Sequence, residues 1–240
     1  MIELPPREAH LWHLRPDPLP DETIAALDAL LSADERERGA RVIPAPARHR
    51  HLLTRALVRT TLSRYEPVAP GTWRFVANQW GRPAIDPAVC ATDLRFNLSH
   101  CDGLIVCAVA RGVDLGVDVE DRGRRINYLG VGQRVFSPAE LAELRAASPA
   151  ERPARFFDYW TLKEAYIKAR GMGLALPLRA ISFDLRGAAP TAAFEPSVQD
   201  DAREWQFERR AIGGHAIALA IRAAGQPFLV RMMPSSAPLR

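Results

Sequence analysis

The sequence predicts an α+β fold of two similar halves, each with a small, mainly antiparallel sheet packed by helices. Helical spacing and strand-like alternation of apolar residues both occur, the order of helices followed by strands occurs twice, and the turns between strands are short. With 240 residues, of which 48% are hydrophobic and 25% charged, the chain can form one large or two small cores. The halves are expected to be residues 1–115 and 116–240, although their sequence identity is too faint to prove duplication.

The first half is predicted to begin with helices and to end in strands. Apolar residues at helical spacing indicate a helix over 21–42 and, after a proline-containing break, another over about 47–65. Residues 73–77 alternate like a strand. Three further strands with glycine turns between them predict an antiparallel meander whose middle strand is buried on both faces. These strands are expected at 94–100, 104–110 and 115–120.

The second half is predicted to repeat this order. Ser137 and Glu140 form a capping-box pattern that opens a helix to about Ala147, and a longer helix follows over 156–171. Residues 187–201 are rich in Ala, Pro and Asp and are expected to be a loop. Strands are expected at 180–185, 204–209 and 215–221.

The composition favours a protein without membrane spans, disulfides or a zinc site. No run of 18 apolar residues occurs, so no membrane span is expected, and the N-terminus lacks the basic and apolar regions of an export signal. We therefore expect a cytoplasmic protein. Three cysteines without a CxxC spacing indicate neither a disulfide framework nor a zinc site. A net charge of +4 fits an acidic macromolecular partner or a polyphosphate ligand without choosing between them.

The long helix of the second half carries a carboxylate on its apolar side. Phe156, Phe157, Trp160 and Ile167 recur at helical spacing, and Glu164 falls inside that stripe. A carboxylate in such a position has to be paired, or it has to hold a cation.

The two lysines beside Glu164 are the only lysines of the chain, whereas arginine occurs 30 times. Lys163 and Lys168 lie towards the two edges of the same face. One interpretation is an ordinary helix salt bridge between Glu164 and Lys168, which contributes about 0.3 to 0.5 kcal/mol. The other is that these positions need a compact ammonium group, which approaches an oxygen or passes a proton more readily than a guanidinium group does.

Two further carboxylates alternate along the predicted strand 115–120. Asp118 and Glu120 lie on the face opposite the valines, about 7 Å apart, so they repel unless a positive charge lies between them. If this polar face meets the long helix, Glu164 becomes a third oxygen ligand. Three oxygen ligands with open positions suit Mg²⁺, which takes phosphate oxygens as further ligands. The alternative is that Asp118 and Glu120 lie on a solvent-facing edge.

Two groups of the first half are candidate phosphate ligands. Ser99 and His100 end a predicted strand, and a hydroxyl and an imidazole beside a metal site are good donors to a pyrophosphate. The basic cluster at 48–51 is either a solvated face or a phosphate contact. A structural role is the alternative for His100.

The two carboxylate-bearing segments resemble a known family. Residues 116–120, followed by 160–168, resemble the paired signature of 4'-phosphopantetheinyl transferases. Gly81-Arg82-Pro83, Phe96 to His100 and the glycine loop Gly171 to Leu174 match further landmarks in the right order. The resemblance covers roughly residues 30–185. The length and doubled order are similar to the Sfp-type branch, whose members are monomers with two halves that imitate a dimer and bind coenzyme A between them.

The resemblance implies an activity and a catalytic group. The reaction is the Mg²⁺-dependent transfer of the phosphopantetheine arm from coenzyme A to a serine of an apo acyl or peptidyl carrier protein, with Mn²⁺ as an alternative ion. Asp118, Glu120 and Glu164 are expected to hold the metal. Glu164 is also expected to be the base, directly or through a metal-bound water, and Lys168 is expected to neutralise charge on the transferring phosphate.

The resemblance also implies which residues contact coenzyme A. The first half is expected to bind its 3'-phosphate and adenine side, the second half carries the metal and the catalytic helix, and the active site is expected at their interface. Glu35 occupies a position where some members have a lysine. The expected phosphate contacts are Arg38, Arg50, Arg82, Ser99, His100, Lys163 and Lys168.

Two non-catalytic alternatives remain at this point. A basic module that binds nucleic acid through the arginines of 48–59 explains the charge but not the three carboxylates, and no nucleic-acid motif is present. We therefore expect no nucleic-acid partner. A protein that only binds coenzyme A or a carrier is the second alternative. Carrier proteins are acidic, so a basic chain fits a transient electrostatic encounter with them.

Overall fold

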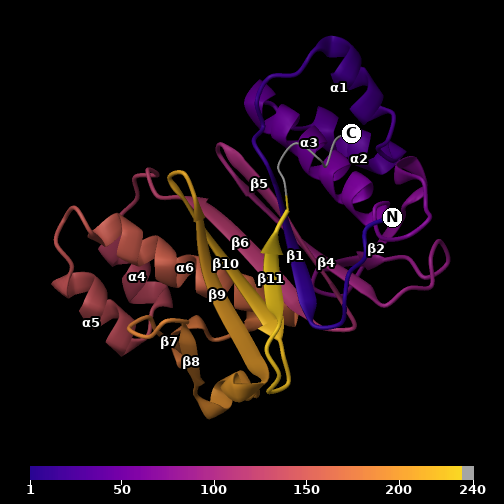
Figure 1. The fold of residues 1–240 in the computed structure, drawn as a ribbon. Coiled ribbons are helices and arrows are strands. Elements are labelled where there is room, and N and C mark those ends of the chain that lie inside the picture. Colours follow the sequence, from indigo (N-terminus) through magenta and orange to yellow (C-terminus); the bar gives the residue numbers. More distant parts are fainter. Residues whose placement is uncertain (234–240) are drawn as a thin grey trace. The chain divides into compact units, whose positions relative to one another are not determined.

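The computed structural model describes residues 1–233, which divide into two compact units (Figure 1). Unit 1 comprises 1–78, 83–112 and the segment that begins at Leu229, and unit 2 comprises 79–82 and 113–228. The expected division at residue 115 placed everything after it in the second half. The segment from Leu229 instead pairs with a strand of unit 1.

Unit 1 contains a four-stranded sheet with the order β11-β1-β5-β4 and a separate hairpin of β2 and β3. β5 pairs with β1 and β4 in antiparallel fashion, whereas β11 adds to β1 in parallel. The elements are β1 (Glu8–Leu14), α1 (Asp21–Asp28), α2 (Ala33–Ala40), α3 (Ala45–Leu62), β2 (Phe75–Ala77), β3 (Pro83–Ile85), β4 (Leu94–Cys101), β5 (Leu104–Arg111) and β11 (Leu229–Met232).

The core of unit 1 lies between α3 and this sheet. Leu53 and Leu57 of α3 are buried in one cluster with Trp12 of β1 and Ile105 of β5. All residues of β5 except its last are buried. The prediction that this strand is buried on both faces is confirmed.

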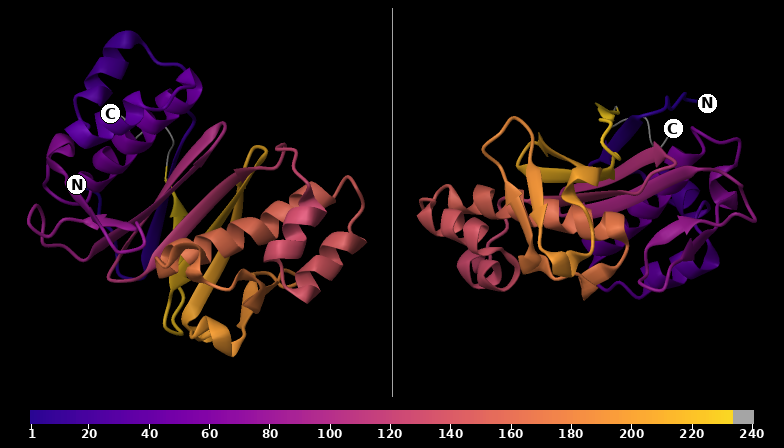
Figure 2. Two further views of the ribbon diagram at one scale, coloured as in Figure 1. Left: turned by 180° about the vertical axis from the view of Figure 1, so that it is seen from behind. Right: turned by 90° about the horizontal axis from the view of Figure 1, so that it is seen from below.

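Unit 2 contains a three-stranded antiparallel sheet with the order β6-β10-β9 and a hairpin of β7 and β8. The longest helix, α6, crosses one face of the sheet (Figure 2). The elements are β6 (Leu115–Asp121), α4 (Tyr128–Val135), α5 (Pro138–Ala146), α6 (Arg152–Arg170), β7 (Ile181–Asp184), β8 (Thr191–Phe194), β9 (Trp205–Ile212) and β10 (His215–Arg222).

The two units share one topology. Each runs through a strand, three α-helices, a small hairpin and two further strands, apart from short 3₁₀ turns. In unit 1 the last strand of the series, β5, lies between the first strand β1 and the preceding strand β4. In unit 2, β10 lies between β6 and β9 in the same way. The predicted α+β class with two similar halves is therefore confirmed, and β11 is an addition outside the repeat.

Several elements differ from the sequence prediction. The single helix over 21–42 is wrong, because α1 ends at Asp28 and Ser32 starts a separate helix, α2, with a capping box. The meander is wrong in its third strand, since β6 pairs with β10 and not with β5. The loop expected at 187–201 contains β8, which pairs with β7. β1, β11 and α4 were not predicted.

Other local predictions are confirmed. The box of Ser137 and Glu140 caps α5, with both reciprocal hydrogen bonds present. Gly171 ends α6 in the left-handed conformation, with φ of 62°. In the described part of the chain, no helix combines the length and the apolar character needed to cross a membrane.

Candidate active site

The polar face of β6 lies directly against α6. Gly116 shares this face with Asp118 and Glu120, and a Cβ atom at Gly116 would collide with the backbone of Ala165 and Ala169. Glycine therefore lets the helix backbone rest on the strand. The polar face of the strand therefore meets the long helix, which is the condition under which the sequence makes Glu164 a third oxygen ligand.

Hydrogen bonds join the strand to one stripe of the helix. The indole Nε1 of Trp160 donates to Oε1 of Glu120 at 3.1 Å. Nζ of Lys168 donates to Oδ1 of Asp118 at 2.6 Å and to the carbonyl of Val117 at 3.2 Å. Glu164 lies between Trp160 and Lys168, four residues from each, and so belongs to the same stripe. The structure thus brings Asp118, Glu120, Glu164 and Lys168 together.

The carboxylates of this group act on one another electrostatically. The pKa of Glu164 is raised to about 7, first by burial and then by the charge of Asp118, whereas the charge of Lys168 opposes the shift. Burial, and then the charge of Asp118, also raises the pKa of Glu120, whereas Arg124 at 3.2 Å lowers it. The group therefore has more negative charge than its basic neighbours neutralise, which is an environment that favours a bound cation.

The side chains of these carboxylates do not have the arrangement of a complete metal site. Among residues 1–233 no group of three His, Cys, Asp or Glu side chains has an arrangement that could hold an ion as it stands. The chemistry of the donors nevertheless fits a hard divalent cation, because all three are carboxylates and two of them alternate on one strand face.

Lys163 does not join this group. Its side chain is 1% exposed, and Nζ contacts Oε2 of Glu140 at 2.8 Å. It also donates to the carbonyl of Leu178 at 2.9 Å and to that of Ile181. Burial lowers the pKa of Lys163, and the charge of Glu140 opposes that shift. In place of the expected phosphate contact the structure shows a buried ion pair, because the side chain points away from Trp160, Glu164 and Lys168 into the core.

Arg82 belongs to unit 2 and lies at the C-terminal end of α6. Its Nη1 donates to Oδ1 of Asp114 at 2.9 Å and to the carbonyl of Ala169 at 2.6 Å. A cation at the end of a helix is favourably placed for the helix dipole, so Arg82 also supports the end of α6 that carries Lys168.

The other candidate ligands belong to unit 1. Ser99 is buried and His100 is exposed near the end of β4. Nη1 of Arg50 contacts Oδ1 of Asp102 at 2.5 Å. Arg38 is exposed on α2, 4.0 Å from Asp34. A cavity of about 1010 Å³ in this unit is lined by basic side chains together with apolar and acidic ones. Its basic residues are Arg15, Arg36, Arg48, His49, Arg50 and His51.

Known proteins match this chain over the segment that carries the candidate site. Residues 114–220 match the model of the 4'-phosphopantetheinyl transferase superfamily. The 4'-phosphopantetheinyl transferase HetI of Nostoc sp. is 33% identical over 218 residues, which are 91% of this chain and 88% of the relative. The chain belongs to the 4'-phosphopantetheinyl transferase family. The matched segment contains β6 and α6 with all four residues of the candidate site.

Further relatives agree with this assignment. The 4'-phosphopantetheinyl transferase Sfp of Bacillus subtilis is 32% identical over 168 residues, which are 70% of this chain and 72% of the relative. A crystal structure of a holo-(acyl-carrier-protein) synthase from Bacillus anthracis, in complex with CoA (3',5'-ADP), is 19% identical. It covers 45% of this chain and 95% of its own, with a TM-score of 0.38, so the family assignment rests on the sequences.

Glu35, which stands where some family members have a lysine, has a structural role in this transferase. It caps α2 with Ser32, and its carboxylate accepts from Nε and Nη2 of Arg59 at 3.0 and 2.7 Å. Arg59 is 1% exposed and also donates to the carbonyls of Pro70 and Trp73. The Ser-x-x-Glu spacing at 32–35 is a capping-box signal from which this role could have been predicted.

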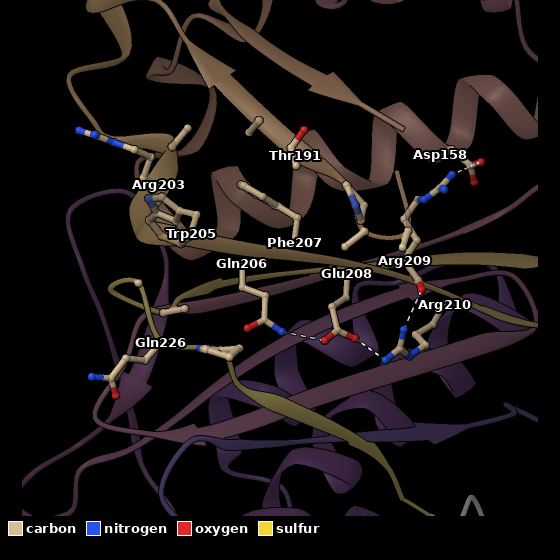
Figure 3. A pocket seen from close by; sticks show the side chains of 18 of the residues that line it. Asp158, Thr191, Arg203, Trp205, Gln206, Phe207, Glu208, Arg209, Arg210 and Gln226 are labelled. Atoms are coloured by element: carbon tan, nitrogen blue, oxygen red, sulfur yellow. Dashed lines mark hydrogen bonds and ion pairs between the residues drawn. The ribbon is translucent and has the colours of Figure 1, made fainter. Parts of the chain in front are cut away.

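A second cavity of this transferase, of about 930 Å³, runs along the open edge of β9 in unit 2 (Figure 3). None of the four candidate site residues lines it. At one end Arg209 of β9 donates to Asp158 of α6 at 2.9 Å, and Arg122 contacts the same carboxylate at 2.6 Å. Asp158 thus ties the helix to the sheet. The sequence gives no signal for this role, since a charge near the start of a helix is a common surface feature.

Proposed function

We propose that this protein transfers the 4'-phosphopantetheine arm of coenzyme A to a serine hydroxyl of an apo acyl or peptidyl carrier protein and releases adenosine 3',5'-bisphosphate. One observation carries the proposal. Trp160, Glu164 and Lys168 form a stripe on α6 that lies against Asp118 and Glu120 of β6. This arrangement lies within the segment that matches the transferase family.

We assign the roles of base and charge neutraliser to the helix. A serine hydroxyl is a weak nucleophile, and it needs a base within hydrogen-bond reach. Glu164 is the carboxylate for this role, because it lies on α6 between the strand carboxylates and Lys168. Lys168 supplies a compact positive charge for the phosphate that is transferred.

We assign Mg²⁺ to Asp118, Glu120 and Glu164, with Mn²⁺ as an alternative. Oxygen ligands suit both ions, and the excess negative charge of the three carboxylates favours a cation. When bound, the ion neutralises charge on the pyrophosphate and orients it.

The residues of unit 1 and Arg82 are assigned to the rest of coenzyme A. Arg50 lines the larger basic cavity and is the proposed contact of the 3'-phosphate, with Arg38 as an accessory charge. Ser99, His100 and Arg82 are the proposed donors to the remaining phosphates. These assignments stay predictions. Measuring the KM for coenzyme A and for 3'-dephospho-coenzyme A in an Arg50→Ala variant tests the first of them.

We propose that the carrier is bound transiently, because a net charge of +4 favours a fast encounter with an acidic domain. The monomeric state and the cytoplasmic location also stay predictions. Size-exclusion chromatography with light scattering tests the former.

Intact mass spectrometry tests the proposed function. An apo carrier protein is incubated with this protein, coenzyme A and Mg²⁺, with and without EDTA. A mass gain of one phosphopantetheine arm that EDTA abolishes is the expected result. No gain with several unrelated carriers, despite measurable coenzyme A binding, would leave a protein that only binds coenzyme A or carriers.

A further inference from the structure

Lys163 is a buried cation without a part in the proposed reaction. Its ammonium group is surrounded by three oxygens, one from Glu140 and two from the carbonyls of Leu178 and Ile181. A compact ammonium group fits between three convergent acceptors, whereas the planar, larger guanidinium group does not. This geometry accounts for one of only two lysines in a chain with 30 arginines.

Glu140 extends the contact to further parts of unit 2. Its Oε2 accepts from the backbone N–H of Ser137 at 2.8 Å, and its Oε1 accepts from that of Phe183 at 2.9 Å. Glu140 and Ser137 are 1% and 2% exposed. One ion pair therefore connects α6 with the first turn of α5, the segment that follows the glycine loop, and β7.

Lys163 lies on α6 directly beside the stripe of Trp160, Glu164 and Lys168. Lys163 immediately precedes Glu164, and successive side chains of a helix are about 100° apart. The core holds α6 through Lys163 on one side, while Trp160, Glu164 and Lys168 face β6 on another. The contacts of Lys163 therefore restrain the rotation of the helix and, with it, the position of Glu164 relative to the strand.

We propose that Lys163 and Glu140 are positioning residues for the transfer reaction, which act by holding Glu164 in register with Asp118 and Glu120. The proposal rests on the proposed function above. The pair touches neither the strand carboxylates nor the stripe directly, so its effect is on the rate of the chemical step and not on coenzyme A binding.

The test uses one single and one double variant. Lys163→Met leaves a buried carboxylate without its cation, which can prevent folding, whereas Lys163→Met/Glu140→Gln removes both charges. Glu143→Ala is the matched control. Glu143 also joins α5 to α6, by accepting from Tyr159 at 2.6 Å and from Arg155 at 3.1 Å, but it is 39% exposed, and both of its partners lie farther from Glu164 along α6 than Lys163 does.

Two readouts are measured at a temperature at which circular dichroism shows each variant folded. The first is the kcat and the KM for coenzyme A. The second is the indole ¹⁵N–¹H resonance of Trp160, which Trp160→Phe identifies among the five tryptophans. This resonance reports the register of α6 on β6, because Trp160 donates to Glu120.

For the double variant we expect the kcat to fall about tenfold or more, the KM for coenzyme A to change less than about threefold, and the Trp160 resonance to shift. Glu143→Ala should leave all three near their unaltered values at a comparable loss of thermal stability. A folded double variant with unaltered kcat and an unaltered Trp160 resonance would overturn the proposal. A raised KM with unaltered kcat would overturn it in favour of a direct coenzyme A contact.

A transfer assay with the unaltered protein distinguishes a failure of this proposal from a failure of the proposed function. If the unaltered protein transfers no phosphopantetheine arm, the proposed function fails. In that case the Trp160 resonance still decides whether Lys163 and Glu140 set the register of α6, since that measurement needs neither coenzyme A nor a carrier.

Discussion

At the scale of single residues, both lysines of the chain contact several oxygens at once. Lys168 contacts Asp118 and the carbonyl of Val117, and Lys163 contacts Glu140 and two carbonyls. A need for a compact ammonium group at both positions is one of the two interpretations that the sequence allows, beside an ordinary helix salt bridge. The structure places Lys168 in the stripe with Trp160 and Glu164 and points Lys163 into the core, a difference that the sequence does not reveal because both lysines flank Glu164.

Replacing Glu164 with glutamine is expected to stop transfer while coenzyme A binding persists. Glutamine keeps the size of the side chain but cannot accept the proton of the serine, so the kcat should fall about 100-fold or more. The mass-gain assay measures the rate, and titration calorimetry measures coenzyme A binding. Glu151→Gln, at the start of α6, is the control. Full activity of Glu164→Gln would remove this carboxylate from the mechanism.

Replacing Glu35 with alanine is expected to lower the free energy of unfolding by about 3 to 5 kcal/mol. The reason is that Arg59 would remain buried without its carboxylate. Urea unfolding measures the change. Glu37→Ala is the control on the same helix, since Glu37 is 65% exposed in its pair with Arg41 and should contribute less than about 1 kcal/mol. Equal effects in the two variants would contradict the buried role of Glu35.

At the scale of elements, the site depends on how closely α6 approaches β6. The alternation of Leu115 to Glu120 and the helical spacing of 156–171 predict both elements and the faces that meet. The capping box of α5 can also be predicted from local sequence. The strand that pairs with β6 cannot be predicted in this way, because the pairing of β6 with β10 joins residues about a hundred positions apart. No local pattern distinguishes β10 from β5 as the neighbour of β6.

Replacing Gly116 with alanine is expected to destabilise the protein by about 1 to 3 kcal/mol and to lower activity. The new Cβ atom would collide with the backbone of Ala165 and Ala169, so α6 would have to move away from the strand carboxylates. Thermal unfolding and the transfer rate measure the two effects. Gly214→Ala is the control, since a Cβ atom there meets nothing within 4 Å. An unaltered rate in Gly116→Ala would show that the close approach is not needed.

At the scale of the whole molecule, the order of a strand, helices, a hairpin and two strands occurs twice, whereas the candidate site residues differ between the two units. The carboxylates and both lysines lie in unit 2, and α2 and α3 of unit 1 carry Arg38 and Arg50 in the corresponding part of the series. Sequence patterns predicted the repetition but missed its first strand, because Glu8 and His10 are polar residues on a strand buried over most of its length. Glu8 and His10 share a hydrogen bond, Glu8 also pairs with Arg231, and His10 also contacts Tyr65.

The net charge of the whole molecule leads to a prediction about salt. We expect a higher NaCl concentration, about 0.5 M instead of about 0.05 M, to raise the apparent KM for an acidic carrier several-fold at saturating coenzyme A. The kcat should stay nearly unaltered, because screening weakens the electrostatic encounter and not the bound complex. Steady-state kinetics with one carrier measure both values. A fall in kcat at constant KM would contradict an electrostatic encounter.

The return of β11 to β1 sets an order of events during synthesis on the ribosome. Unit 2 is nearly continuous in the chain from 113 to 228, so its residues are made in one stretch. The sheet of unit 1 receives its edge strand only when Leu229 to Met232 emerge, after all of unit 2 has been made. Until then the β1 edge of a sheet whose other strands were made early stays open to pairing with a neighbouring nascent chain.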